Sequence, residues 1–190
     1  GQTWTHTETP AIRTVIYRNG TFFATGTTGD PGGTTKEATS TNGLDWTQFA
    51  DSSGSSIFAN ALIEEGGVYF AVGWYGLIAS SPDGSQWTLH EAGTKANLLS
   101  VAHGPGRFVA VGDAIVVSND GTNWSALDMT FFQPSDRLNG VVYAAGQFVA
   151  VGDRGTIISS VDGVYWQRRS STSQVNPKAV RFGNGNFIVT

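Results

Sequence analysis

Four short stretches of this sequence bring an acid or amide, a hydroxyl and an indole together at fixed spacing. They read STNGLDW at 40–46, SPDGSQW at 81–87, SNDGTNW at 118–124 and SVDGVYW at 160–166. A carboxylate near a hydroxyl could serve acid–base chemistry or metal binding. The same residues also close a compact turn, because Ser, Asp and Asn side chains accept N–H groups from the backbone that follows them. We expect the turn, since the pattern recurs along the chain. Its residues are Ser40, Asn42, Gly43, Trp46, Ser81, Asp83, Gly84, Trp87, Ser118, Asp120, Gly121, Trp124, Ser160, Asp162, Gly163 and Trp166.

The other residue types that carry chemistry do not gather into a site. The three histidines are far apart in the repeat, and there is no cysteine. Neither the spacing of metal ligands nor a Ser/His/Asp set is found. We therefore predict no catalytic residue, no metal site and no cofactor.

The composition excludes some classes of partner. Charged residues make up only 14% of the chain and the net charge is −4, so the basic surface that nucleic acid requires is missing. No apolar run reaches the roughly 18 residues of a membrane span. Few lysines, many Ser, Thr and Gly residues and no cysteine are typical of exported bacterial proteins, so we expect a secreted or cell-surface location.

The elements that position these residues repeat with a period of about 40 residues. Each unit has a short apolar strand, a Gly turn, a second strand such as FVAVG, a third strand such as GTIIS, the turn motif and a fourth strand. Four antiparallel strands of this kind form one blade of a β-propeller. We predict an all-β propeller with about five blades visible in a single domain, 1–190. The expected blades span 11–49, 57–90, 97–127, 138–169, and a split blade of 177–190 plus 1–8.

The recurring motif resembles the Asp box, Ser/Thr-x-Asp-(x)-Gly-x-x-Trp, of sialidase-type (BNR) propellers. The pattern VAVGDxGTIxxSxDGxxW is also similar to YVTN-like repeats and to the photosystem II assembly-factor propellers. The resemblance covers nearly the whole chain and implies that the Asp boxes lie opposite the functional face. A sialidase would also need an arginine cluster, a Tyr–Glu pair and an acid/base Asp, and this sequence does not show that set.

The ends of the sequence leave two interpretations of the ring. GQTW at 1–4 matches the second half of the turn motif, and FIVT at 187–190 matches a second strand. Either the N-terminal strand completes the last blade of a five-bladed ring, or the chain is part of a larger propeller. A cut propeller exposes strand edges, so self-association is a further possibility.

The candidate ligand-binding residues lie where the chain enters the innermost strands, at the mouth of the central channel. At this position four of the five blades carry a polar side chain, which either solvates the channel or binds a polar ligand. Trp74 and Tyr75 occupy a short loop on the same face, where they either cap the neighbouring blade or stack on a partner. The candidates are Arg13, Asn60, Trp74, Tyr75, Asn139 and Lys178.

These features favour a non-enzymatic scaffold for contact with a protein or a glycan. The alternative is a lectin-type or glycoside-hydrolase-like propeller with its site at the channel mouth. Likeness of fold does not choose between them.

Overall fold

The computed structural model describes residues 11–27, 35–49, 59–84, 86–128, 136–171 and 176–190. Blade 1 consists of β1 (Ala11–Arg18), β2 (Thr21–Thr27), β3 (Thr35–Ser40) and β4 (Thr47–Phe49). Blade 2 consists of β5 (Ala59–Glu65), β6 (Val68–Gly73), β7 (Ile78–Ser81) and β8 (Thr88–His90). Blade 3 consists of β9 (Leu98–Gly104), β10 (Arg107–Gly112), β11 (Ile115–Ser118) and β12 (Trp124–Ala126). Blade 4 consists of β13 (Leu138–Ala144), β14 (Gln147–Gly152), β15 (Thr156–Ser160) and β16 (Gln167–Arg168), and blade 5 of β17 (Val180–Gly183) and β18 (Asn186–Val189).

Each of the first four blades is a meander of four antiparallel strands, and the described part of blade 5 is a two-stranded hairpin. This confirms the predicted all-β fold of four-stranded antiparallel blades, with five blades in sequence. The predicted contribution of residues 1–8 to the last blade lies outside the described residues.

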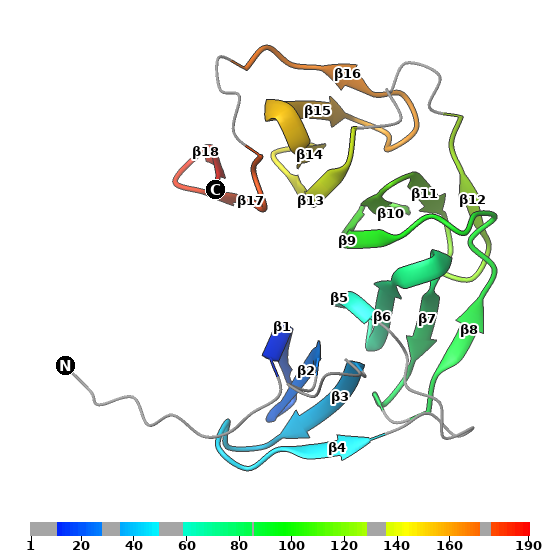
Figure 1. Cartoon of the computed structure of the whole chain (residues 1–190), viewed down its shortest axis with the longest axis vertical. Helices are drawn as coiled ribbons and strands as arrows, with labels where there is room; N and C mark the ends of the chain where they lie inside the picture. Colours follow the sequence, from blue (N-terminus) through cyan, green and yellow to red (C-terminus); the bar gives the residue numbers. More distant parts are fainter. Residues whose placement is uncertain (1–10, 28–34, 50–58, 85, 129–135, 172–175) are drawn as a thin grey trace.

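The blades follow one another around a common centre, as in a β-propeller (Figure 1). The first strand of every blade is innermost, and β1, β5, β9, β13 and β17 contact one another in that order. Blade 5 stands apart from blade 1, so the described strands form an open arc rather than a closed ring (Figure 1).

The inner hairpins are closed by tight turns that demand left-handed backbone. Asn19 and Gly20 join β1 to β2 with φ of 49° and 81°, and Asn184 and Gly185 join β17 to β18 with φ of 50° and 76°. Asn–Gly suits such a two-residue turn, because both residues tolerate positive φ and the turn matches the twist of the strands.

The hydrophobic core lies between the blades. In β10, Val109 and Val111 pack with Phe148 of blade 4, whereas Phe108 and Ala110 pack with Phe70 of blade 2. A strand points successive side chains to opposite faces, so one alternating run of apolar residues supplies two interfaces.

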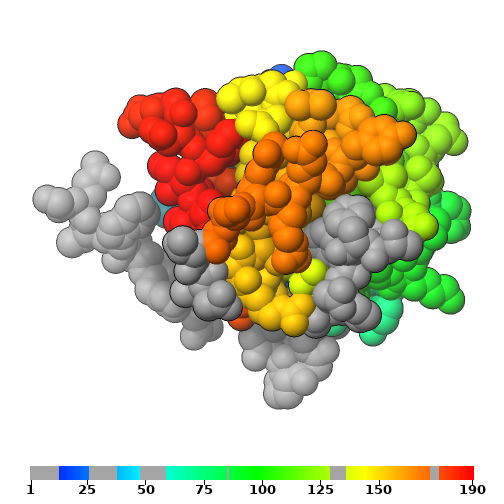
Figure 2. All heavy atoms as spheres, turned by 90° about the horizontal axis from the view of Figure 1, so that it is seen from above, coloured from blue at the N-terminus to red at the C-terminus, as the bar shows by residue number. Residues whose placement is uncertain are grey.

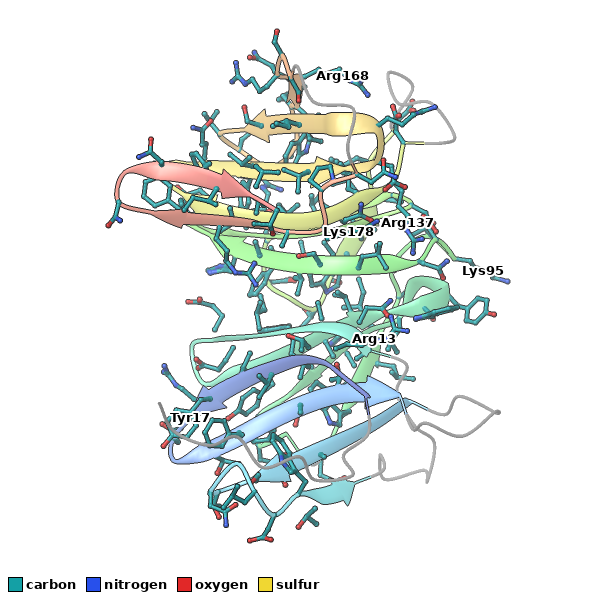
Figure 3. All side chains as sticks on the ribbon, turned by 60° about the vertical axis from the view of Figure 1, so that its left-hand side comes forward. Arg13, Tyr17, Lys95, Arg137, Arg168 and Lys178 are labelled. Carbon is teal, nitrogen blue, oxygen red and sulfur yellow. The ribbon has the colours of Figure 1, made fainter. Side chains whose placement is uncertain are left out.

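Because each blade is an antiparallel meander, its loops fall at two opposite ends. One end carries the hairpin turns and the Asp-box turns. The other carries the loops between second and third strands and the segments that lead into each inner strand. We call this second end the rim. Arg13, Arg137 and Lys178 lie at the rim, and Tyr17 lies towards the opposite end (Figure 3).

Candidate functional site

The Asp-box turns are closed by their own side chains. In the third box, Ser118 Oγ accepts the N–H of Gly121 at 2.9 Å and donates to Asp120 Oδ1 at 3.0 Å. The same Oδ1 accepts the N–H groups of Thr122 at 2.9 Å and Asn123 at 2.8 Å. In the first box Asn42 takes the place of Asp, and its Oδ1 accepts the N–H groups of residues 44 and 45. An amide oxygen can therefore do what the carboxylate does in this turn.

These hydrogen bonds also set the ionisation of the carboxylates. Hydrogen bonds from Asn123, first its backbone N–H and then its side chain, hold the pKa of Asp120 far below its usual range. At Asp162 partial burial raises the pKa of the carboxyl. Hydrogen bonds from the N–H groups of Tyr165 and Val164 lower this pKa by more than burial raises it, so the net shift is downward. Both carboxylates are charged acceptors within their own turns, which is the opposite of what a general acid at neutral pH requires.

Three of the candidate ligand-binding residues meet at the rim between blades 1 and 2. Asn60 is only 8% exposed, and its Oδ1 accepts Trp74 Nε1 at 2.8 Å and Arg13 Nη1 at 3.3 Å. Its Nδ2 donates to the carbonyl of Leu98 in blade 3 at 2.8 Å. Asn60 thus joins three blades through one amide group.

Tyr75 lies beside them on a backbone that is fixed in an unusual conformation. The 3-10 turn Trp74–Gly76 places Tyr75 at φ 56°, and its N–H donates to Asn97 Oδ1 of blade 3 at 3.1 Å. A Cβ on Gly76 would collide with the carbonyl oxygen of Thr94, so the turn fits against the next blade without room for a side chain. Trp74 is nevertheless 42% exposed and Tyr75 is 76% exposed.

Asn139 and Lys178 meet at the rim between blades 4 and 5. Asn139 Nδ2 donates to Asp153 Oδ1 and to the carbonyl of Pro177, both at 2.9 Å. Lys178 Nζ lies 3.7 Å from the same Asp153 oxygen, and its side chain is 73% exposed. The six candidate residues therefore form two groups at one end of the molecule. Arg13, Asn60, Trp74 and Tyr75 lie in one group, and Asn139 and Lys178 lie in the other.

The amides of Asn60 and Asn139 make equivalent bonds, because each donates to the carbonyl just before the corresponding residue of the next blade. A role in joining blades is therefore shown for both side chains, and their role in binding a ligand stays a prediction.

Sequence reasoning missed two asparagines that connect the blades. Asn97 accepts the N–H of Tyr75, and Asn176 accepts the N–H of Arg154 at 2.7 Å. Arg154 is the residue of blade 4 that is equivalent to Tyr75, and it has a similar φ of 58°. Asn97 and Asn176 occupy the same place in the repeat, two residues before the polar position on the inner strand. That shared offset was the available signal.

A buried acid lies at the outer part of blade 4. The side chain of Asp136 is 3% exposed and forms ion pairs with Arg154 and with Arg168, the latter at 2.8 Å. A carboxylate held between two guanidinium groups is neutralised, so this cluster ties the loop before β13 to β16 and to the turn after β14.

The described residues contain no group of three or more His, Cys, Asp or Glu side chains arranged to hold a metal ion. No helix in that part of the chain is long and apolar enough to cross a membrane.

No known protein family and no curated protein matches this sequence. Solved structures match the fold at low identity. Virginiamycin B lyase from Staphylococcus aureus is 13% identical with a TM-score of 0.74, over 93% of this chain and 61% of that chain. A structure of the nidogen/laminin complex is 18% identical with a TM-score of 0.62, over 90% and 68%. YCF48 bound to D1 peptide is 16% identical with a TM-score of 0.53, over 80% and 50%. The chain thus spans between half and about two thirds of the length of these three proteins.

Proposed function

We propose that this chain is a non-enzymatic β-propeller scaffold that binds a protein partner at the rim between blades 1 and 2. We call the binding surface the aromatic corner, defined as Arg13, Asn60, Trp74 and Tyr75. The observation that carries the proposal is an exposed Trp–Tyr pair on a backbone that the neighbouring blade holds in place.

The aromatic corner is organised before any partner arrives. Trp74 is fixed through its indole N–H to Asn60, and Tyr75 is fixed through its backbone N–H to Asn97. A side chain that is already ordered loses little entropy on binding, so its contact area contributes more to affinity. Exposed Tyr and Trp rings supply such area and are enriched where partners bind most strongly.

The polar part of the corner favours an acidic or hydroxylated group on the partner. Arg13 is exposed, and one of its nitrogens is bonded to Asn60 at 3.3 Å. A guanidinium has five N–H donors, so others can bind a carboxylate. Two structures with a similar fold contain protein or peptide partners, nidogen with laminin and YCF48 with D1 peptide.

Glycan binding is the second candidate, and the exposed indole and phenol rings favour it as well. A sugar ring stacks on an aromatic face while its hydroxyls bond to Arg and Asn side chains. We also propose that the protein is exported or located at the cell surface, which rests on its composition of few lysines and no cysteine.

Binding to a peptide array and to a glycan array, followed by titration of the best ligand, tests the proposal. We expect Tyr75→Ala and Trp74→Phe each to weaken binding at least about tenfold. Tyr75→Ala removes an exposed aromatic ring, and Trp74→Phe removes the indole N–H that holds the ring of Trp74 to Asn60. Tyr165→Ala is the matched control, because Tyr165 is 80% exposed but lies on an Asp-box turn at the opposite end. Equal loss in Tyr165→Ala and Tyr75→Ala, or no loss in any variant, would remove the aromatic corner as the binding surface. Peptide hits support the first candidate and glycan hits the second.

A further inference from the structure

Blade 4 carries three charged residues that the neighbouring blades 2 and 3 do not have at the equivalent positions. Asp136 lies two residues before β13, and Arg168 lies in β16. Arg154 lies in the 3-10 turn Asp153–Gly155, between β14 and β15. The outer part of blade 4 (orange) faces the viewer in Figure 2 and forms part of the molecular surface. Three separate segments of the chain thus bring their charges together at the outer part of one blade.

Blade 3 shows that the fold does not require these charges. Ala96 lies two residues before β9, at the place that Asp136 has before β13. Ala126 pairs with the third strand of blade 3 as Arg168 does with that of blade 4. The connection between β10 and β11 is shorter and has no counterpart of Arg154. Because a blade with the same strands forms without the cluster, the architecture alone does not explain why these positions differ together in blade 4.

The cluster combines one buried acid with two half-exposed bases. The side chain of Asp136 is 3% exposed, whereas those of Arg154 and Arg168 are 54% and 55% exposed. One carboxylate neutralises one guanidinium, so a surplus positive charge remains in a chain whose net charge is −4. Each guanidinium has five N–H donors, and a carboxylate offers about four acceptor positions. The two arginines therefore have more donors than Asp136 can accept, and both side chains reach solvent.

Asp136 holds the two guanidinium groups close together. Nη2 of Arg154 donates to Oδ1 of the acid, and Nη2 of Arg168 donates to Oδ2 at 2.8 Å. Both oxygens belong to one carboxyl group, so one small ligand can reach both arginines. The backbone of Arg154 is also fixed, with φ 58° and its N–H bonded to Asn176 Oδ1 at 2.7 Å. Glycine or asparagine would adopt this left-handed backbone more easily, so arginine here has a conformational cost that its side chain must offset.

We propose that Arg154 and Arg168 bind a tetrahedral oxyanion, the group present in sulfate, in phosphate and in their monoesters. A guanidinium can donate two parallel N–H bonds to such a group, and bonds between charged partners are stronger than bonds between neutral ones. The oxygens of a tetrahedral anion point in several directions, so one anion can accept from both arginines. A carboxylate has two oxygens in one plane and should bridge the two arginines less well. This site lies on blade 4 and is separate from the aromatic corner.

Titration of the 190-residue chain with sodium sulfate, at constant ionic strength, tests the proposal. The side-chain Nε–H signals of the arginines, followed by NMR, report which of them the anion contacts. We expect saturable shifts for Arg154 and Arg168, and weaker binding of acetate than of sulfate. Arg168→Leu should weaken sulfate binding at least about tenfold, because one of the two guanidinium groups is lost. Arg169→Leu is the matched control, since it removes the same charge from the next residue, which is also exposed, and should leave binding unchanged.

A double variant keeps the proposal testable if Arg168→Leu does not fold. Asp136→Ala combined with Arg168→Ala introduces the residues of blade 3 at both positions and leaves the net charge of the chain unchanged. It removes the buried acid together with one of its partners, so we expect it to fold and to bind sulfate at least about tenfold more weakly than the parent. Trp74→Phe should bind sulfate as the parent does, so this proposal and the proposed function can fail separately.

Phenyl phosphate and inorganic phosphate, compared at pH 8, distinguish the two sources of the anion. Equal or tighter binding of phenyl phosphate supports an oxyanion at the end of a larger ligand, and much weaker binding supports the free anion.

Three results would overturn the proposal. The first is the absence of saturable shifts at Arg154 and Arg168. The second is equal binding by the double variant and the parent, or equal loss in Arg168→Leu and Arg169→Leu, which would show only a general attraction to positive charge. The third is acetate that binds as tightly as sulfate, which would make this a carboxylate site.

Discussion

At the scale of single residues, the hydroxyl of Ser118 is central to its turn. Ser118 is 2% exposed, and its hydroxyl accepts the N–H groups of Gly121 and Asp120 and donates to the Asp120 carboxylate. One buried atom therefore holds three partners. The Asp120 carboxylate, by contrast, is exposed, and Asn42 shows that an amide can replace it.

We predict that Ser118→Ala lowers the free energy of unfolding by about 1–3 kcal/mol, because the buried N–H of Gly121 loses its acceptor. Ser125→Ala is the control, since Ser125 is exposed on the neighbouring strand β12 and should change stability little. Urea denaturation at neutral pH measures both. Equal midpoints for the two variants would show that the hydroxyl does not hold the turn.

His90 provides a pH dependence. Burial lowers the pKa of His90, and the Asp120 carboxylate raises it by a smaller amount, so the pKa of the folded state lies below its usual value of about 6.5. The folded state therefore favours neutral imidazole. The stability that neutral His90 contributes is complete above about pH 6.5, the ordinary pKa of the unfolded chain. It is lost as the pH falls through the lower pKa that His90 has in the folded protein.

We accordingly expect the urea midpoint of the parent chain to fall between pH 7.5 and pH 5 by more than that of His90→Leu. Leucine is the residue at the equivalent position of blade 3, so it suits the fold and does not titrate. Other ionisable groups contribute equally to both proteins and cancel in the comparison. An identical pH dependence in the two proteins would show that the pKa of His90 is not lowered by folding.

At the scale of the element, the Asp-box turns join neighbouring blades as well as their own strands. Gly121 has φ 76°, and a Cβ on it would lie 2.5 Å from a ring carbon of Phe70 in blade 2. Gly106, in the hairpin between β9 and β10, has φ 69° but no atom within 4 Å of the same position. The two glycines share the backbone requirement and differ in their surroundings.

We predict that Gly106→Ala costs about 1–2 kcal/mol through its left-handed backbone alone. Gly121→Ala should cost about 1–3 kcal/mol more, because Phe70 must move out of a packed interface. Thermal denaturation of both variants checks this. If Gly121→Ala loses no more stability than Gly106→Ala, Phe70 can move within the interface between blades 2 and 3 at little cost.

The sequence predicted local features well and contacts between blades poorly, for a physical reason. Strands, hairpin turns and Asp boxes depend on residues a few positions apart, so their pattern repeats visibly. Alignment of the repeat also placed Arg13, Asn60 and Trp74 at one rim. It could not reveal that the amide of Asn60 reaches Leu98, since that contact depends on how two sheets dock. The pairing of Asp136 with Arg154 and Arg168 was missed for the same reason, because these residues have no counterpart pattern in other blades.

At the scale of the whole molecule, burial is uneven around the arc. Val109 and Val111 in β10, and Ala150 in β14, are fully buried between the four-stranded blades 3 and 4. On the last hairpin Phe182, Ile188 and Val189 are 40%, 53% and 39% exposed. Blades with two covered faces should open far less often than a hairpin with one.

We therefore expect hydrogen exchange to be slowest in β10 and β14 and fastest in β18, with a finer pattern inside β18. The N–H of Ile188 bonds across to β17, so it should exchange more slowly than those of Phe187 and Val189, which face outward. Exchange followed by NMR resolves individual amides and tests both levels. Uniform protection across the blades would show that the arc opens as one cooperative unit. Protection of Phe187 and Val189 equal to that of Ile188, in the chain alone, would show instead that the outer edge of β18 is already paired.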